Sequence, residues 1–214
     1  MAKEREKARR AQAAAARQEL KQRARRMALI RRAVLGIVVL GAVGGAGYWF
    51  LKDRQFAAGL VTASYPAAQH LPGPLSYRES PPLGGPHNVV WQTCGIYTVP
   101  IHNEHAVHAL EHGAVWITYR PDLPPGDVQR LQTLASDDYM LLSPYPGLPA
   151  PVVVSAWNNQ MRLTGADDPR LPAFIRRFKN NPDTTPEFGA SCLGGTPASA
   201  RDDSLNTGSG PMVQ

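Results

Sequence analysis

Hydrophobic and polar positions divide the chain into a charged leader, one long apolar run and a mixed remainder. Residues 33–51 (AVLGIVVLGAVGGAGYWFL) carry no charge over 19 positions, which is long enough for a helix to cross the roughly 30 Å hydrocarbon layer of a membrane. Tyr48 and Trp49 lie near its end, and such rings favour a membrane interface. The pattern therefore predicts a transmembrane helix over 33–51.

Beyond residue 70 the pattern is typical of short alternating elements. Residues 70–94 are irregular and rich in Pro and Gly, which fix turns. Asn158 and Asn159 suit a tight hairpin turn. The expected strands are 95–100, 114–119, 139–142, 152–157 and 160–163, and the expected helices are 105–112, 125–135 and 168–179. This order predicts a mixed sheet covered by helices, of the α+β or α/β class.

The charge of the leader predicts how the chain is oriented in the membrane. Residues 1–32 hold twelve Lys and Arg against three Glu, and such an excess of cations stays in the cytoplasm. We expect an uncleaved single-pass anchor in the cell membrane, with everything after it extracytoplasmic. A cleaved signal peptide is the alternative, although the leader is long for one and bulky Tyr48 and Trp49 follow the small residues 45–47.

The remainder of the chain predicts one folded domain. We expect a stalk over 52–69, a domain over 70–195, and a small, polar, disordered tail over 196–214. The whole chain has a net charge of +6, but residues 52–214 carry eleven Lys and Arg against fourteen Asp and Glu. Without the leader the chain is therefore acidic, and this excludes nucleic-acid binding by the outer domain.

The histidines are the best indication of chemistry, because all six fall between His70 and His112. At about 100° per residue, His105, His108 and His112 share one face of a helix, with Glu104 and Glu111 beside them. The opposite face holds Ala106, Val107 and Leu110. Asn103 suits the start of this helix and Gly113 its end.

Imidazoles beside carboxylates are a ligand set that zinc, copper(II) or nickel prefers over calcium or magnesium. The sequence thus predicts a centre for zinc or copper(II) on this helix. The alternative is a structural or partner-binding domain of the cell envelope, in which these side chains form a buried hydrogen-bond network.

A third hypothesis is a zinc hydrolase. His108-x-x-Glu111-His112 fits the H-x-x-E-H pattern, with Glu111 as general base, and Glu187 would be a further ligand. Gly113 and the β-branched run after it end the helix at the motif, whereas such peptidases embed it within a helix. Neither a G-x-S-x-G motif nor a Walker phosphate loop occurs. We therefore expect a protein that is not an enzyme.

Cys94 and Cys192 are the only cysteines, and they lie near the two ends of the expected domain. A disulfide is the simplest interpretation in a compartment that permits one. It would close a loop of about 100 residues, which the chain-entropy model values at up to about 4–5 kcal/mol. Free thiols, or thiolate ligands joining the histidines, are the alternatives.

Several motifs together resemble a known family. They are Pro81-Pro82-Leu83-Gly84-Gly85-Pro86-His87, Trp91, Cys94-Gly95-Ile96-Tyr97 and Val107-His108-Ala109-Leu110-Glu111-His112-Gly113. The sequence is similar to the bacterial family known as domain of unknown function 3105. The resemblance implies a membrane-anchored or secreted protein whose PPxxGxH and VHxLEHG motifs form the site.

The resemblance changes the expected ligand set. It nominates His87, His108, Glu111 and His112, and His70 fits an upstream histidine of the family, whereas His105 lies outside the motifs. His87 follows a rigid Pro/Gly turn, and a preset loop ligand that meets two helix ligands is a common way to build a three-histidine site. The alternative for this turn is a purely structural role.

Overall fold

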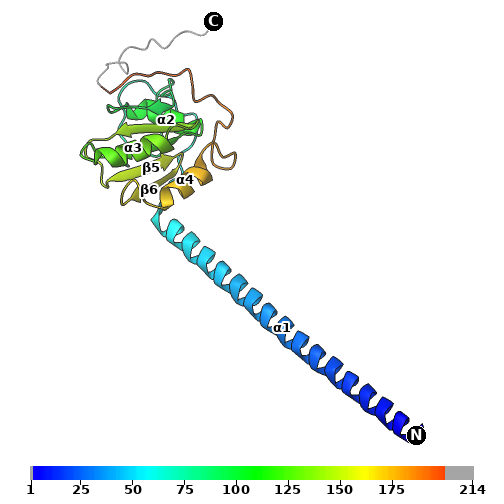
Figure 1. Cartoon of the computed structure of the whole chain (residues 1–214). Helices are drawn as coiled ribbons and strands as arrows, with labels where there is room; N and C mark the ends of the chain where they lie inside the picture. The colour runs from blue at the N-terminus through cyan, green and yellow to red at the C-terminus, as the bar shows by residue number, and fades with distance from the viewer. Residues whose placement is uncertain (1, 201–214) are drawn as a thin grey trace. The chain divides into compact units, whose positions relative to one another are not determined.

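The computed structural model describes residues 2–200, which divide into two units, one up to Gln55 and one from Phe56 onward. In the first unit the chain forms a single helix, α1, which spans Ala2–Gly59 and ends in the second unit (Figure 1). Apolar side chains such as Ile37 and Leu40 are exposed along it. The part over 17–59 is long and apolar enough to cross a membrane.

The second unit is built on a six-stranded mixed sheet. In order across the sheet the strands are β1 (Leu60–Thr62), β6 (Asn159–Leu163), β5 (Val152–Ala156), β3 (Val115–Tyr119), β4 (Met140–Pro144) and β2 (Gly95–Ile96). β2, β4 and β3 are parallel, and the other neighbours are antiparallel. The predicted mixed sheet of the α+β class is confirmed.

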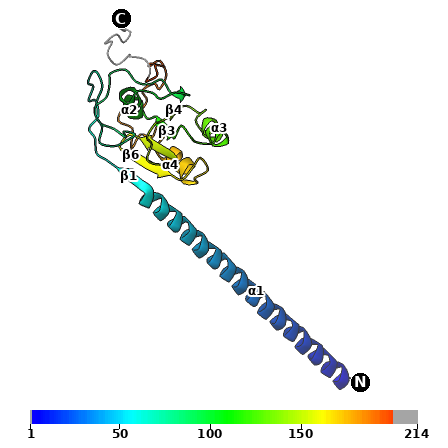
Figure 2. The same ribbon diagram turned by 90° about the vertical axis from the view of Figure 1, so that its left-hand side faces the viewer.

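Helices cover both faces of this sheet. α3 (Pro125–Leu134) and α4 (Arg170–Phe178) place Leu131 and Phe174 in the core on one face, whereas α2 (Asn103–Glu111) places Leu110 in the core on the other. Figure 2 shows α2 and α3 on opposite sides of β3 and β4. Successive strand residues point to opposite faces, so Ile117 packs beneath α3 and α4, and its neighbour Trp116 packs against α2.

The fold differs from the sequence expectations at its margins. The segment 52–69, expected as a stalk, contains the end of α1, the core residue Phe56 and the edge strand β1. β1 was not expected because its three residues give no periodicity, and its pairing with β6 is a long-range contact. The expected strand 95–100 is shorter than predicted and pairs with β4 only over Gly95–Ile96. The backbone N–H of Tyr97 donates to the carbonyl oxygen of Leu142 where this pairing ends.

The beginning of the expected tail is also bound to the domain. The backbone N–H of Thr196 donates to the carbonyl oxygen of Trp91, and that of Ala200 donates to Pro100. The rest of the expected tail, 201–214, lies outside the described residues.

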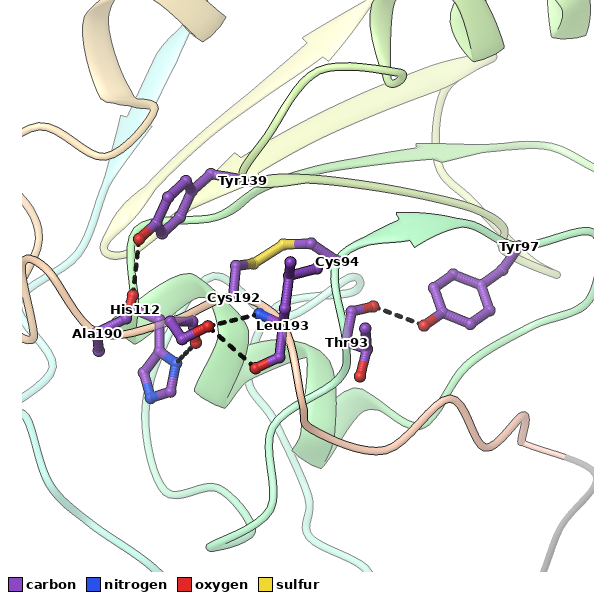
Figure 3. Close-up of a disulfide and its surroundings, with 9 residues drawn as sticks. Thr93, Cys94, Tyr97, His112, Tyr139, Ala190, Cys192 and Leu193 are labelled. Carbon is purple, nitrogen blue, oxygen red and sulfur yellow. Dashed lines mark hydrogen bonds between the residues drawn. A yellow bond between two sulfur atoms is a disulfide. The ribbon is translucent and has the colours of Figure 1, made fainter.

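Cys94 and Cys192 are joined as a disulfide, with their Cα atoms 5.4 Å apart. The bond ties the C-terminal segment to the loop before β2, close to the end of α2 that carries His112 (Figure 3). It therefore fixes a segment that turns out to border the histidine cluster.

Candidate metal centre

The polar face of α2 is buried, although it carries five ionisable side chains. Glu104, His105, His108, Glu111 and His112 are each no more than 5% exposed. The loop between β1 and β2 and the segment after α4 cover them. α2 begins at Asn103, but its N-cap residue is His102, which makes no capping hydrogen bond through its side chain. The expectation that Asn103 caps this helix is therefore wrong by one position.

Gly113 ends the helix as the sequence predicts. Its φ is +99°, and a Cβ at this position would lie only 3.0 Å from Cα of Asn180. Both observations require glycine, since the left-handed region is unfavourable for other residues.

The three histidines of the polar face, and His87 from the loop between β1 and β2, each have the Nδ1 atom against a backbone carbonyl. The distances are 2.8 Å from His87 to Gly85, 2.7 Å from His108 to Asn88, 2.8 Å from His112 to Ser191 and 2.6 Å from His105 to Val90. A carbonyl oxygen only accepts, so Nδ1 carries the hydrogen in each ring. In the neutral imidazole Nε2 then presents a lone pair.

A first group consists of His70, His87, His108 and Glu111, whose ligand atoms all lie within 4.8 Å of one another. The ring centroids of the three histidines are 4.8 Å apart in every pair. His70 and His87 come from the loop before α2, held side by side by backbone hydrogen bonds between residues 69–71 and His87. His108 and Glu111 come from α2.

Within this group two acceptors face each other. Nε2 of His87 lies 2.9 Å from Oε2 of Glu111, both side chains are fully buried, and neither atom has a hydrogen-bond partner of good geometry. The other oxygen of Glu111 accepts the backbone N–H of Ala68 at 2.6 Å. Because lone pairs repel, this contact needs a proton or a cation beside it.

The shifted pKa values of His108 and Glu111 leave both side chains unprotonated at neutral pH, so both can offer a lone pair to an ion. Burial lowers the pKa of His108 to about 3, against a smaller opposing effect of its hydrogen bond to Asn88. Burial alone would raise the pKa of Glu111, but its close contact with His87 and the hydrogen bond from the backbone N–H of Ala68 outweigh burial, so the pKa is lowered. At neutral pH His108 is therefore a neutral imidazole and Glu111 a carboxylate.

A second group consists of His108, His112 and Glu187, again with ligand atoms within 4.8 Å. Oε2 of Glu187 lies 3.0 Å from Nε2 of His112 and 4.0 Å from Nε2 of His108. Glu187 is in the loop after α4, where its backbone N–H donates to the carbonyl oxygen of Glu111. The two groups therefore share His108 and adjoin.

The structure brings together most of the residues that the sequence nominates. His87, His108, Glu111 and His112 belong to the two groups, together with His70 and Glu187. Among the described residues His105 belongs to neither group. It shares the helix face, but its ring turns to the carbonyl of Val90, and burial lowers its pKa.

These donors are better suited to holding a metal ion than to hydrolysis. Imidazole nitrogens with one carboxylate are the ligands of zinc or copper(II). The hydrolase hypothesis requires a glutamate free to take a proton from water, but Glu111 is fully buried and holds the N–H of Ala68. α2 also ends at Glu111, so His112 is its C-cap.

The fold and the site together define a class: a mixed-sheet domain after an apolar helix, with a buried His/Glu cluster between one sheet-covering helix and its loops. The chain belongs to the family described as protein of unknown function (DUF3105), whose model matches residues 70–194. No curated protein and no solved structure matches the chain.

Proposed function

We propose that this protein binds one divalent transition-metal ion, zinc or copper(II), in a domain on the outer side of a bacterial cell membrane. The ligands are Nε2 of His87 and His108, a ring nitrogen of His70 and the carboxylate of Glu111. The observation that carries the proposal is the contact between His87 and Glu111, in which two buried acceptors face each other at 2.9 Å.

The outer contacts of the ligands support this assignment. Histidines that bind metals almost always donate their second ring N–H to a carbonyl or carboxylate, which fixes the tautomer and the ring orientation. His87 and His108 both do so through Nδ1. The ligands are thereby oriented before any ion binds, so little conformational entropy is lost on binding.

The same surroundings argue against copper(I). Soft thiolate and thioether ligands select copper(I), but Cys94 and Cys192 are paired. Met140 and Met161 are buried in the core on the other face of the sheet. Only nitrogen and oxygen donors are therefore available among the described residues of the centre.

Metal analysis of the full-length chain, purified in detergent without an affinity tag, tests the proposal. We expect about one zinc or copper ion per chain after equilibration with the metal and removal of excess. His87→Gln and His108→Gln should lose it. His102→Gln is the matched control, because His102 precedes the same helix but belongs to neither group.

The exposed ligand His70 covers the case in which the buried variants fail to fold. His70→Gln should keep the near-ultraviolet circular dichroism of the natural chain and bind metal more weakly. A folded natural chain that takes up no metal, or equal metal content in all variants, would refute the proposal. Such a result would favour a structural hydrogen-bond network.

The location of the domain is a second part of the proposal. The excess of cations over 1–32 and the apolar helix after it favour a cytoplasmic N-terminus. Single cysteines at exposed positions, Lys3→Cys and Asp122→Cys, report the sides of the membrane. In intact cells a membrane-impermeant maleimide should label only Asp122→Cys, and labelling of Lys3→Cys alone would reverse the orientation.

A further inference from the structure

Two ligand groups compete for one nitrogen of His108. His108 contributes to the inner group with His70, His87 and Glu111, and to the outer group with His112 and Glu187. Its Nδ1 bonds to the carbonyl of Asn88, so Nε2 alone remains for an ion. One lone pair binds one ion, and the two groups therefore cannot each hold an ion through His108 at the same time.

The two groups differ in access and in rigidity. In the inner group the side chains of His87 and Glu111 are fully buried, and the N–H of Ala68 fixes the carboxylate of Glu111. In the outer group the side chain of Glu187 is 36% exposed. The backbone N–H of Glu187 donates to the carbonyl of Glu111 at 3.1 Å, so an exposed carboxylate is tied next to the buried one.

We propose that His108, His112 and Glu187 form an entry position through which the ion reaches the inner centre, an inference that rests on the proposed function. Glu187 attracts the hydrated cation, and Nε2 of His112 and of His108 replace two of its waters. His108 keeps its bond while His87 and Glu111 replace His112 and Glu187. The ion thus passes inward without losing all protein ligands, and the proton that the contact between His87 and Glu111 holds without an ion passes to water.

The kinetics of copper(II) binding by the full-length chain in detergent test this inference. Trp91 and Trp157 lie beside the cluster, with ring centroids 4.9 Å from His112 and 5.8 Å from His87. Copper(II) quenches nearby tryptophan fluorescence, so stopped-flow fluorescence follows association, and displacement by a chelator follows dissociation.

Glu187→Gln should slow association at least about tenfold, since steering by a charged group changes on-rates by this order or more. It should slow dissociation by the same factor, because the ion leaves by the route by which it enters, and the Kd then stays nearly constant. Asp183→Asn is the matched control. It removes an exposed carboxylate four residues away that belongs to neither group, and both rates should stay unchanged.

Three outcomes would overturn the entry position while leaving the inner centre intact. They are unchanged rates in Glu187→Gln, a raised Kd caused by faster dissociation alone, and two ions bound per natural chain. If the natural chain binds no copper(II) or zinc at all, the proposed function fails and this inference fails with it.

Discussion

Replacement of Glu111 by glutamine separates a metal ligand from a structural carboxylate. Glu111→Gln keeps the shape of the side chain and removes its charge. Oε1 of the amide can still accept the N–H of Ala68, which now lies at 2.6 Å. The new NH₂ group can donate to Nε2 of His87, which faces Oε2 at 2.9 Å. The substitution therefore turns an acceptor pair into a hydrogen bond.

The magnitudes follow from this count of hydrogen bonds. One bond is kept and one is gained, and a net hydrogen bond contributes about 0.5–1.5 kcal/mol. The free energy of unfolding of the metal-free protein should thus change by no more than about 1.5 kcal/mol. The affinity for zinc should fall at least about 100-fold, or about 2.7 kcal/mol, because the only anionic ligand of the inner group is lost.

Glu104→Gln is the matched control for this experiment. Glu104 lies on the same helix, is buried, and accepts the N–H of Leu75 at 2.7 Å, but it belongs to neither ligand group. We expect it to leave the zinc affinity unchanged. Chemical denaturation followed by fluorescence and competition with a zinc chelator give the two quantities for the full-length chain in detergent.

Two results would refute this reasoning. A loss of more than about 3 kcal/mol in metal-free Glu111→Gln would show that the charge itself stabilises the fold, as expected when one partner of a buried ion pair is removed. A zinc affinity equal to that of Glu104→Gln would show that Glu111 is not a ligand.

Three further predictions concern the frame around the centre. Cys94→Ser with Cys192→Ser should lower the free energy of unfolding by about 2–4 kcal/mol; chemical denaturation measures this, and an unchanged midpoint would contradict it. Asp168 is buried, and its carboxylate accepts hydrogen bonds from Arg170 and from the backbone and side chain of Thr164; the bond with Arg170 holds the pKa of Asp168 well below its ordinary value. The stabilisation that the Asp168 carboxylate gives the fold is therefore complete above about pH 4 and is lost as the pH falls toward the lowered pKa. Asp168→Asn should lower the free energy of unfolding by about 2 kcal/mol at pH 7. If the free energies of unfolding of the variant and the natural chain do not converge in acid, the assignment is refuted. Phe174→Ala should cost about 3–5 kcal/mol, because this ring is fully buried between α4 and the sheet, and a cost below about 1 kcal/mol would mean that the core relaxes around the cavity.

The regular elements of the domain could be predicted because their periodicity is local. The run over 114–119 is apolar except for Thr118 and forms β3, which is buried on both faces, as such runs predict. Leu171, Phe174 and Phe178 repeat at helical spacing and form the buried stripe of α4. β1 could not be predicted, since its pairing with β6 joins residues about 100 positions apart.

The candidate site was predictable in composition but not in geometry. The motif over 107–113 nominates His108, Glu111 and His112, and the Pro/Gly turn nominates His87. Helical spacing also groups His105 with His108 and His112, yet His105 contacts Val90 and belongs to neither ligand group. Glu187 was expected only as a further ligand of a zinc hydrolase, and its place beside His112 depends on how the segment after α4 folds back onto the end of α2.

The sequence by itself determined the apolar helix long enough to cross a membrane, the order of the elements and the residue types of the centre, because each depends on neighbours within a few positions. The tertiary structure alone decided which ring nitrogens and carboxylate oxygens lie close enough to bind one ion. Backbone carbonyls of Asn88 and Ser191 orient His108 and His112 from segments distant in the chain, whereas the carbonyl of Gly85 orients His87 from within its own turn. The ring orientations of His108 and His112 depend on these long-range hydrogen bonds, and no local pattern of side chains encodes them.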